Sequence, residues 1–332
     1  MTIIRKSPSS ARGRSRRRSG LCLGLAGGLF LWGIAAAQSK DQDAGKPGSD
    51  PAVFRFGFSS AMFPSLNVND AKAAVRVWAM TLAREHGIKA DPIPFIFDSL
   101  AELDEALRRK QVDAVAVLTE EYRALSASFP LAPLFVANVN GHTAEELIVL
   151  VHRNSGIANL EDLRGRSLIT HRDPRASLAL PWLDTLLLEK GLRPTADFLG
   201  RVSGSDNLAR VILPVYFRQS EACLVTRGGF DTMTELNPQV GLELMVLASS
   251  PKMVPVLLCI RADYTSSSKD EILQGLRDLH LSPAGRQVLT IFRSGKLEEP
   301  PASSLKIELD LLERREKLGQ TAGPKAPQGR GE

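Results

Sequence analysis

The chain has 332 residues, of which 43% are hydrophobic, 24% charged and 6% aromatic, and this ordinary globular composition excludes collagen-like, coiled-coil and mostly disordered proteins. Its formal net charge of +5 would suit a nucleic-acid binder, but residues 1–37 hold seven basic residues and no acidic one, so the rest of the chain is mildly acidic. A mildly acidic body offers no attractive field to a polyanion, and we therefore expect no nucleic-acid partner.

Residues 1–37 have the three parts of a secretory signal peptide. A basic cluster runs into the apolar stretch Leu21–Ala37, which ends in an A-x-A-like cleavage site. A membrane anchor is the alternative, but the apolar run is shorter than the roughly 20 residues that a spanning helix needs, and four glycines dilute it. We expect export to a bacterial periplasm with cleavage near Ala37, followed by a polar linker over residues 38–52.

Apolar runs and helical patterns alternate from Val53 onward. The first half of the chain predicts strands at 53–59, 94–97 and 112–118, and helices at 70–86, 99–110 and from Thr119. The second half predicts strands at 147–152, 167–170, 198–203, 222–225, 244–248 and 254–260, and helices at 160–165, 177–190, 206–215, 230–236, 268–280 and 282–292. This alternation predicts an α/β fold with mainly parallel sheets that are covered by helices on both faces.

Two cysteines, Cys223 and Cys259, lie in the expected mature chain, and an exported pair could form a disulfide. Each sits in its own apolar run, which favours two separately buried thiols. Neither has a neighbour at metal-ligand spacing, so we expect no metal site.

Catalytic motifs are missing from the sequence. None of the five histidines shows HExxH spacing, and the chain has no G-x-S-x-G, Walker or G-x-G-x-x-G pattern. His171, Asp173 and Ser177 could be drawn as a triad, but three such residues so close in sequence are more often a polar loop. We therefore expect no enzyme and no cofactor.

The order of the predicted elements, together with several short segments, resembles the phosphate, phosphite and phosphonate-binding proteins of ABC transporters. The most specific segment is NLEDLRGRS, which ends at Ser167. The other segments are Phe54–Ser60, Gln111–Ala114, Tyr122 three residues beyond Thr119, Leu186–Pro194 and Val202–Ser205. The resemblance covers roughly Val53 to Phe292.

The resemblance implies a two-lobed periplasmic-binding-protein fold of type 2, in which two α/β lobes close on a ligand about two crossing segments. The expected crossings are Asn140–Glu146 and Val240–Leu244. The expected parts are a first lobe at 53–143 and 245–300, a second lobe at 144–244, a C-terminal helix at 301–318 and a disordered tail at 319–332. The helical pattern at Leu305–Leu318 either packs on the first lobe or extends as an arm for a partner.

In open sheets of this kind, ligands sit outside the carboxyl ends of the strands, where helix N-termini favour an anion. Hydroxyl-bearing turns at these places give the expected ligand-binding residues, which are Ser59, Ser60, Thr119, Tyr122, His171, Ser177, Ser205 and Thr226. Hydroxyls at helix starts are also common caps that touch no ligand, and this alternative stays open for each of them. Phe63-Pro64 either lines the cleft or makes a turn.

The sequence departs from the family pattern at the expected anion site. The family's usual Ser-Thr-Ser-Gly run corresponds here to Asp173–Ala179, where only Ser177 remains as an equivalent. Asp206 stands where a histidine is common, and Thr226 or its neighbour stands where the family has an acidic residue. Arginines are alternative anion ligands because their forked donors suit carboxylate or phosphate, and they could equally be solvated surface residues. The candidates are Arg172, Arg175, Arg201 and Arg227.

We expect a monomeric periplasmic receptor that captures a small anion, either phosphonate- or phosphate-like or a carboxylate, and delivers it to a membrane ABC permease. Ligand contacts to both lobes at once would stabilise the closed state, because a ligand shifts an equilibrium only by its differential affinity. The alternative is a ligand-sensing module that docks on a membrane receptor such as a histidine kinase.

Overall fold

The computed structural model describes residues 53–64, 67–86, 95–300 and 305–321. The predicted signal peptide (1–37), the predicted linker (38–52) and residues 322–332 of the predicted tail lie outside this part of the chain. Within the described residues, no helix has both the length and the apolar character needed to cross a membrane.

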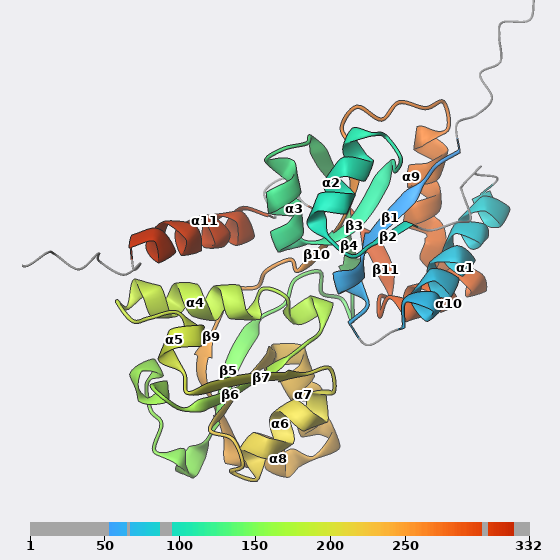
Figure 1. The fold of residues 1–332 in the computed structure, drawn as a ribbon. Coiled ribbons are helices and arrows are strands. Elements are labelled where there is room, and N and C mark those ends of the chain that lie inside the picture. The colour runs from blue at the N-terminus through green and yellow to red at the C-terminus, as the bar shows by residue number, and fades with distance from the viewer. Residues whose placement is uncertain (1–52, 65–66, 87–94, 301–304, 322–332) are drawn as a thin grey trace, which may run out of the picture. The chain divides into compact units, whose positions relative to one another are not determined.

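The first sheet has six strands in the order β11-β4-β10-β3-β1-β2 and draws them from two separate parts of the chain (Figure 1). The strands are β1 (Phe56–Ser59), β2 (Phe95–Phe97), β3 (Ala114–Leu118), β4 (Leu131–Asn138), β10 (Val256–Arg261) and β11 (Lys296–Glu298). The accompanying helices are α1 (Val68–His86), α2 (Leu100–Arg108), α3 (Thr119–Ser126), α9 (Lys269–Asp278) and α10 (Pro283–Ile291), with the short 3₁₀ turns η1 (Ser60–Met62) and η5 (Leu279–Leu281).

The second sheet has five strands in the order β7-β6-β8-β5-β9. The strands are β5 (Leu147–His152), β6 (Ser167–His171), β7 (Arg201–Ser205), β8 (Ala222–Thr226) and β9 (Leu244–Ser249). The helices are α4 (Ala179–Glu189), α5 (Thr195–Phe198), α6 (Leu208–Tyr216), α7 (Arg227–Leu236) and α8 (Pro238–Glu243), with the 3₁₀ turns η2 (Arg153–Ser155), η3 (Leu160–Leu163) and η4 (Pro174–Ala176).

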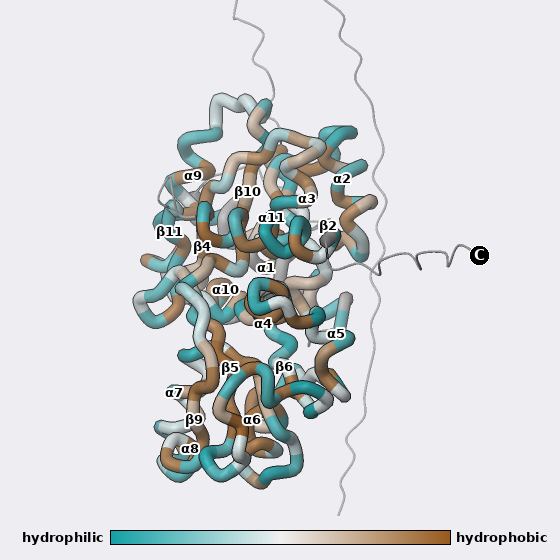
Figure 2. Tube along the Cα trace, turned by 90° about the vertical axis from the view of Figure 1, so that its left-hand side faces the viewer, coloured by the Kyte–Doolittle hydropathy of each residue, from teal (hydrophilic) through white to brown (hydrophobic). Residues whose placement is uncertain are grey.

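Each sheet is buried on both faces, as its continuous apolar runs require. Along β3, Ala114 and Ala116 pack against α1, α9 and α10, while Val115 and Val117 pack toward α2 and α3. All six residues of β5 are buried, and this strand is brown in the hydropathy view (Figure 2). The predicted α/β class with helices on both faces of the sheets is therefore confirmed.

The strand directions differ from the prediction of mainly parallel sheets, because both sheets are mixed. Strand β1 runs parallel to β2 and β3, and β6 runs parallel to β7 and β8. In contrast, β10 is antiparallel to β3 and β4, and β5 is antiparallel to β8 and β9. The antiparallel pairs involve β4, β5, β9 and β10, the strands that precede and follow the two passages of the chain between the sheets.

The chain crosses between the sheets at residues 139–146 and again at residues 250–255. The prediction of a second crossing at Val240–Leu244, and with it the boundary between residues 244 and 245, is wrong. Leu244 pairs with His152, and β9 is the edge strand of the five-stranded sheet. The two crossings are joined directly, because Glu145 and Met253 exchange backbone hydrogen bonds of 2.7 and 2.9 Å.

The two cysteines are free and buried, as predicted. Cys223 lies on β8 in the five-stranded sheet, whereas Cys259 lies on β10 in the six-stranded sheet. Burial in apolar surroundings raises the pKa of both thiols far above the ordinary value, because the thiolate would lose its hydration.

The C-terminal helix α11 (Lys306–Thr321) lies beside α4 and α3 (Figure 1). Leu311 and Leu312 join the core cluster that includes α4, and Arg315 pairs with Asp184 of α4 at 3.0 Å and with Glu120 of α3 at 3.0 Å. The helix thus contacts elements that belong to both sheets, which matches neither predicted alternative. It also includes residues 319–321, which the sequence assigned to the disordered tail.

Near the start of α11, the Glu308 carboxylate is 1% exposed and accepts a hydrogen bond from the backbone N–H of Val254 in the second crossing. Its second oxygen is buried without a partner among the described residues. Burial raises the pKa of Glu308, and the hydrogen bond from Val254 opposes this shift only in part.

We predict that Glu308→Gln stabilises the protein at pH 7.5 and that this gain disappears as the pH falls toward about 4. Because the folded-state pKa is raised, the native carboxyl costs stability once the pH exceeds its unfolded value, and the uncharged amide removes that cost while it keeps an acceptor for Val254. Thermal unfolding between pH 4 and pH 8 measures the difference.

Glu313→Gln is the matched control on the same helix, since Glu313 is largely exposed and pairs with Lys317, which lowers its pKa. This control should not gain stability at pH 7.5. A Glu308→Gln protein that is less stable than the parent at every pH would contradict the electrostatic explanation.

Candidate functional site

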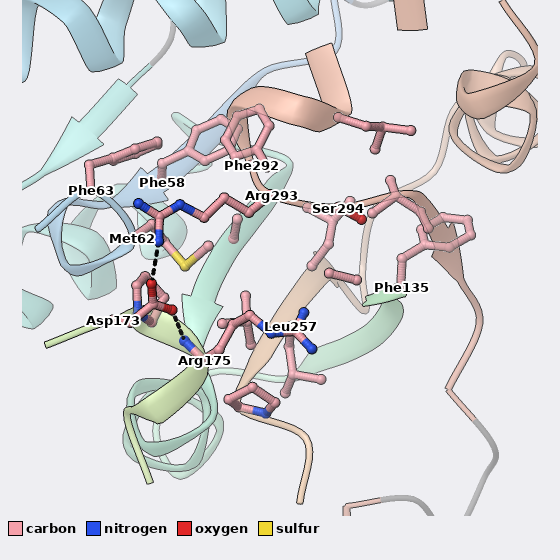
Figure 3. Close-up of a pocket in the computed structure, with 18 of the residues that line it drawn as sticks. Phe58, Met62, Phe63, Phe135, Asp173, Arg175, Leu257, Phe292, Arg293 and Ser294 are labelled. Carbon is pink, nitrogen blue, oxygen red and sulfur yellow. Dashed lines mark hydrogen bonds and ion pairs between the residues drawn. The ribbon is translucent and has the colours of Figure 1, made fainter. Parts of the chain in front are cut away.

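A cavity of about 210 Å³ lies at the edge of the six-stranded sheet where β1 ends and β10 begins (Figure 3). Most of its wall comes from this sheet and from α10. One side is closed by η4, which connects β6 of the five-stranded sheet to α4. Its apolar wall includes Phe58, Met62, Phe63, Leu257, Leu289 and Phe292. The cavity is therefore built by elements from both sheets.

Three phenylalanine rings form one wall of the cavity. Phe58 is the last apolar residue of β1, and η1 then turns the chain so that the Phe63 ring lies 6.0 Å from that of Phe58. Phe292, directly after α10, stacks on Phe58 with ring centroids 5.8 Å apart and 17° between the planes. Aromatic pairs in this range stabilise one another beyond their buried area, which holds this wall in place.

The rim of the cavity carries charged groups that join the two sheets. Asp173 begins η4 by accepting a hydrogen bond from the backbone N–H of Arg175 at 2.9 Å, and its other carboxylate oxygen pairs with Nη1 of Arg293 at 2.6 Å. Arg293 follows α10 and its side chain is 65% exposed, whereas that of Asp173 is 10% exposed. Figure 3 shows the Arg293 guanidinium between the phenylalanine wall and Asp173.

Arg175 forms a second ion pair, with Glu145 in the first crossing. Both side chains are mostly buried, and desolvation lowers the pKa of the Arg175 guanidinium from its ordinary value. A guanidinium stays charged at neutral pH even so. The rim therefore presents two arginines, each with one carboxylate partner.

None of the eight predicted ligand-binding residues lines this cavity. Three of them lie beside it on the six-stranded sheet. The Ser59 hydroxyl donates to Glu121 at 2.6 Å, and the fully buried Thr119 hydroxyl donates to the carbonyl of Val254 at 2.6 Å. Ser60 begins η1 and is half-buried.

Tyr122 and Ser177 flank the second crossing. Tyr122 packs against the core beneath α3, and burial raises its pKa. The Ser177 hydroxyl donates to the carbonyl of Pro255 at 3.3 Å, and the same carbonyl accepts from the backbone N–H of Thr119 at 2.9 Å. The structure thus brings Thr119 and Ser177, one from each predicted lobe, to one carbonyl of the crossing.

The other three predicted residues lie on the five-stranded sheet. His171 and Ser205 are opposite each other in the pairing of β6 with β7, and Nε2 of His171 is 3.3 Å from the carbonyl of Asp206. The buried Thr226 hydroxyl caps α7 by accepting from the N–H of Gly229 at 3.1 Å. Ligand contact by any of the eight stays a prediction.

Of the four arginines that the sequence proposed as anion ligands, only Arg175 lies at the cavity. Arg227 pairs with Glu146 at 2.8 Å, and Arg172 and Arg201 are exposed. The sequence analysis did not predict Asp173 or Arg293 at the cavity, although it weighed Phe63 as a cleft residue. Within the described residues, no group of three or more His, Cys, Asp or Glu side chains could hold a metal ion.

Comparison with protein families matches residues 60–305 to a family described as the periplasmic substrate-binding protein of a phosphonate ABC transporter. A search of curated proteins finds no match.

Solved structures with a similar fold include PA3383 of Pseudomonas aeruginosa, a binding protein component of an ABC phosphonate transporter. It is 15% identical with a TM-score of 0.56, over 85% of this chain and 91% of that one. XAC2383 of Xanthomonas citri is 16% identical with a TM-score of 0.58, and the match covers 81% of this chain and 99% of that one. PhnD1 of Prochlorococcus marinus, solved with methylphosphonate, is 12% identical with a TM-score of 0.54, over 82% and 98%. These likenesses confirm the predicted type 2 fold.

We predict that Thr119→Val lowers the free energy of unfolding by about 1–3 kcal/mol, because the buried carbonyl of Val254 loses its partner while the side-chain shape is kept. Chemical denaturation measures this loss in the absence of any ligand. Thr232→Val is the control, since the exposed Thr232 hydroxyl donates to a carbonyl within its own helix, and its effect should stay within about 0.5 kcal/mol. Unchanged stability of Thr119→Val would show that this hydroxyl does not support the crossing.

Proposed function

The chain belongs to the family of periplasmic substrate-binding proteins of phosphonate ABC transporters, and on this premise we propose that it binds a phosphonate-like anion at the cavity between its two sheets. The family role implies a small-molecule ligand and a membrane permease as partners. We further propose that residues 1–37 are removed on export and that the mature chain delivers its ligand as a monomer.

The ion pair between Asp173 and Arg293 is the observation that supports this site most directly. Asp173 caps η4, which follows β6 of the five-stranded sheet, and Arg293 follows α10, which packs on the six-stranded sheet. The rim of the cavity therefore depends on both sheets. A ligand bound here contacts both sheets at once. Such a ligand favours the arrangement that brings the sheets together, because only there does it gain all its contacts.

The arginines of the rim supply the anion chemistry. The ion pair with Asp173 engages one Nη atom of Arg293, whereas a guanidinium carries five N–H donors. Arg293 therefore keeps donors in a forked geometry that suits a phosphonate, and the mostly buried Arg175 adds a second positive charge elsewhere in the cavity lining.

Ser60 and Tyr122 do not line the cavity, but among the predicted hydroxyls theirs are the best candidates for contact with a ligand that extends beyond it. The hydroxyls of Ser59, Thr119 and Ser177 each donate to an acceptor within the protein. No hydrogen bond joins the hydroxyl of Ser60 or Tyr122 to another side chain or carbonyl among the described residues. Tyr122 also corresponds to the tyrosine of the family pattern.

Ligand titration of the purified protein by isothermal calorimetry tests the proposal. The probes are methylphosphonate, phenylphosphonate, phosphite, inorganic phosphate, acetate, benzoate and methanesulfonate. We expect saturable binding of at least one phosphonate, and a lower affinity at high ionic strength because part of the attraction is between charges at a partly exposed rim. Failure of every anion to bind would overturn the proposed function.

Substitution of the rim arginine gives a sharper prediction. Arg293→Gln should weaken the binding of the best phosphonate by about 10-fold or more, since a hydrogen bond to a charged group contributes about 1.5–3 kcal/mol. Arg201→Gln is the control, because Arg201 is exposed on the edge strand β7 away from the cavity and its loss should leave the affinity unchanged. Equal losses in both variants would indicate a general effect of net charge.

A further inference from the structure

Beyond its charged rim, the cavity is walled by hydrocarbon. Phe58, Phe63 and Phe292 form one side, and Leu257 faces them across the space in Figure 3. An inorganic oxyanion or a methylphosphonate placed at the rim would leave this apolar space to water or empty. Apolar surface that stays exposed in this way contributes nothing to affinity, whereas covering it is favourable.

The size of the cavity fits a ring or a branched hydrocarbon. Its volume is about 210 Å³. An apolar cavity of about 150 Å³ lined by similar side chains is known to bind benzene. The cavity therefore has room for a six-membered carbon ring together with the first atoms of an acidic group.

The Arg293–Asp173 pair and the phenylalanine wall occupy separate parts of the cavity, which orients such a ligand. The guanidinium of Arg293 lies near Asp173 on the η4 side, and the three phenylalanine rings lie beside it. The Arg175 side chain extends away from Asp173 toward Leu257 and pairs with Glu145. A ligand with its acidic group at Arg293 would place its carbon substituent against the Phe58–Phe292 stack.

From this separation we infer that the preferred ligand is a phosphonate that carries a ring or branched hydrocarbon of about the size of benzene. The inference rests on the proposed function, because it assigns the carbon substituent of the anion bound at the same site. The apolar wall then determines selectivity among phosphonates, while the rim arginines hold the group that all phosphonates share.

Calorimetric titration with phenylphosphonate and methylphosphonate tests the inference directly. The full burial of an aromatic ring predicts that phenylphosphonate binds about 10-fold or more tightly than methylphosphonate. Equal affinities, or tighter binding of methylphosphonate, would overturn the inference and leave the proposed function standing. Failure of both phosphonates and of the other anions would overturn the proposed function itself.

A variant that fills the cavity tests whether the phenyl ring of phenylphosphonate binds there. Ala137 lies on β4 and lines the cavity, so Ala137→Leu adds three carbon atoms to the space. We expect this variant to bind phenylphosphonate no more tightly than methylphosphonate, with methylphosphonate affinity unchanged. Ala61→Leu is the matched control, because Ala61 is exposed on η1 outside the cavity lining, and it should alter neither affinity.

Thermal unfolding of each variant shows whether the fold is retained. If Ala137→Leu proves unstable at the assay temperature, Leu297→Phe fills the same space from the neighbouring strand β11, because Leu297 pairs with Ala137 and also lines the cavity. Phenylphosphonate that binds a folded filling variant as tightly as the parent would show that its ring lies elsewhere, and this result would also overturn the inference.

Discussion

The double passage of the chain between its two sheets is the constraint on which the rest of the structure depends. The two crossings are paired by the backbone hydrogen bonds between Glu145 and Met253, so neither can move without the other. Side chains from three further elements then bind the second crossing: Thr119 and Ser177 donate to its carbonyls, and Glu308 accepts from the N–H of Val254. These hydrogen bonds pair backbone N–H and C=O groups of the second crossing that would otherwise lie without a partner between the cores of the two sheets.

The candidate ligand site depends on the same constraint. The turn η4 brings Asp173 and Arg175 to the cavity, and it is fixed to the first crossing through Glu145 and to the second through Ser177. The helix α11 lies against the elements on either side through Arg315, whose guanidinium pairs with carboxylates of α3 and α4. Any movement of one sheet against the other must therefore rearrange the ion pairs at the cavity rim together with those of Arg315 on α11.

Much of the fold could be predicted from local patterns, because apolar periodicity and caps depend on neighbouring residues. Strand β4 escaped prediction because Pro133 interrupts its apolar run, and the structure shows an irregularity in the pairing with β10 beside this residue. The cavity could not be predicted, since Phe58 has the pattern of any core residue and Asp173 meets Arg293 across 120 positions of sequence. The hydroxyls that were predicted as ligand residues have the same sequence pattern as hydroxyls that bond only to the backbone. Thr226 caps α7, and the Thr119 hydroxyl donates to the carbonyl of Val254 in the second crossing.

The placement of Cys223 and Cys259 in different sheets bears on how this chain matures. Each thiol is covered by the core of its own sheet, so neither can reach the other in the folded protein. Within the described residues the folded structure therefore contains no disulfide that has to be made or reshuffled. Because burial also keeps both thiols in the protonated form, they are poor nucleophiles toward oxidants and other thiols while the fold is intact.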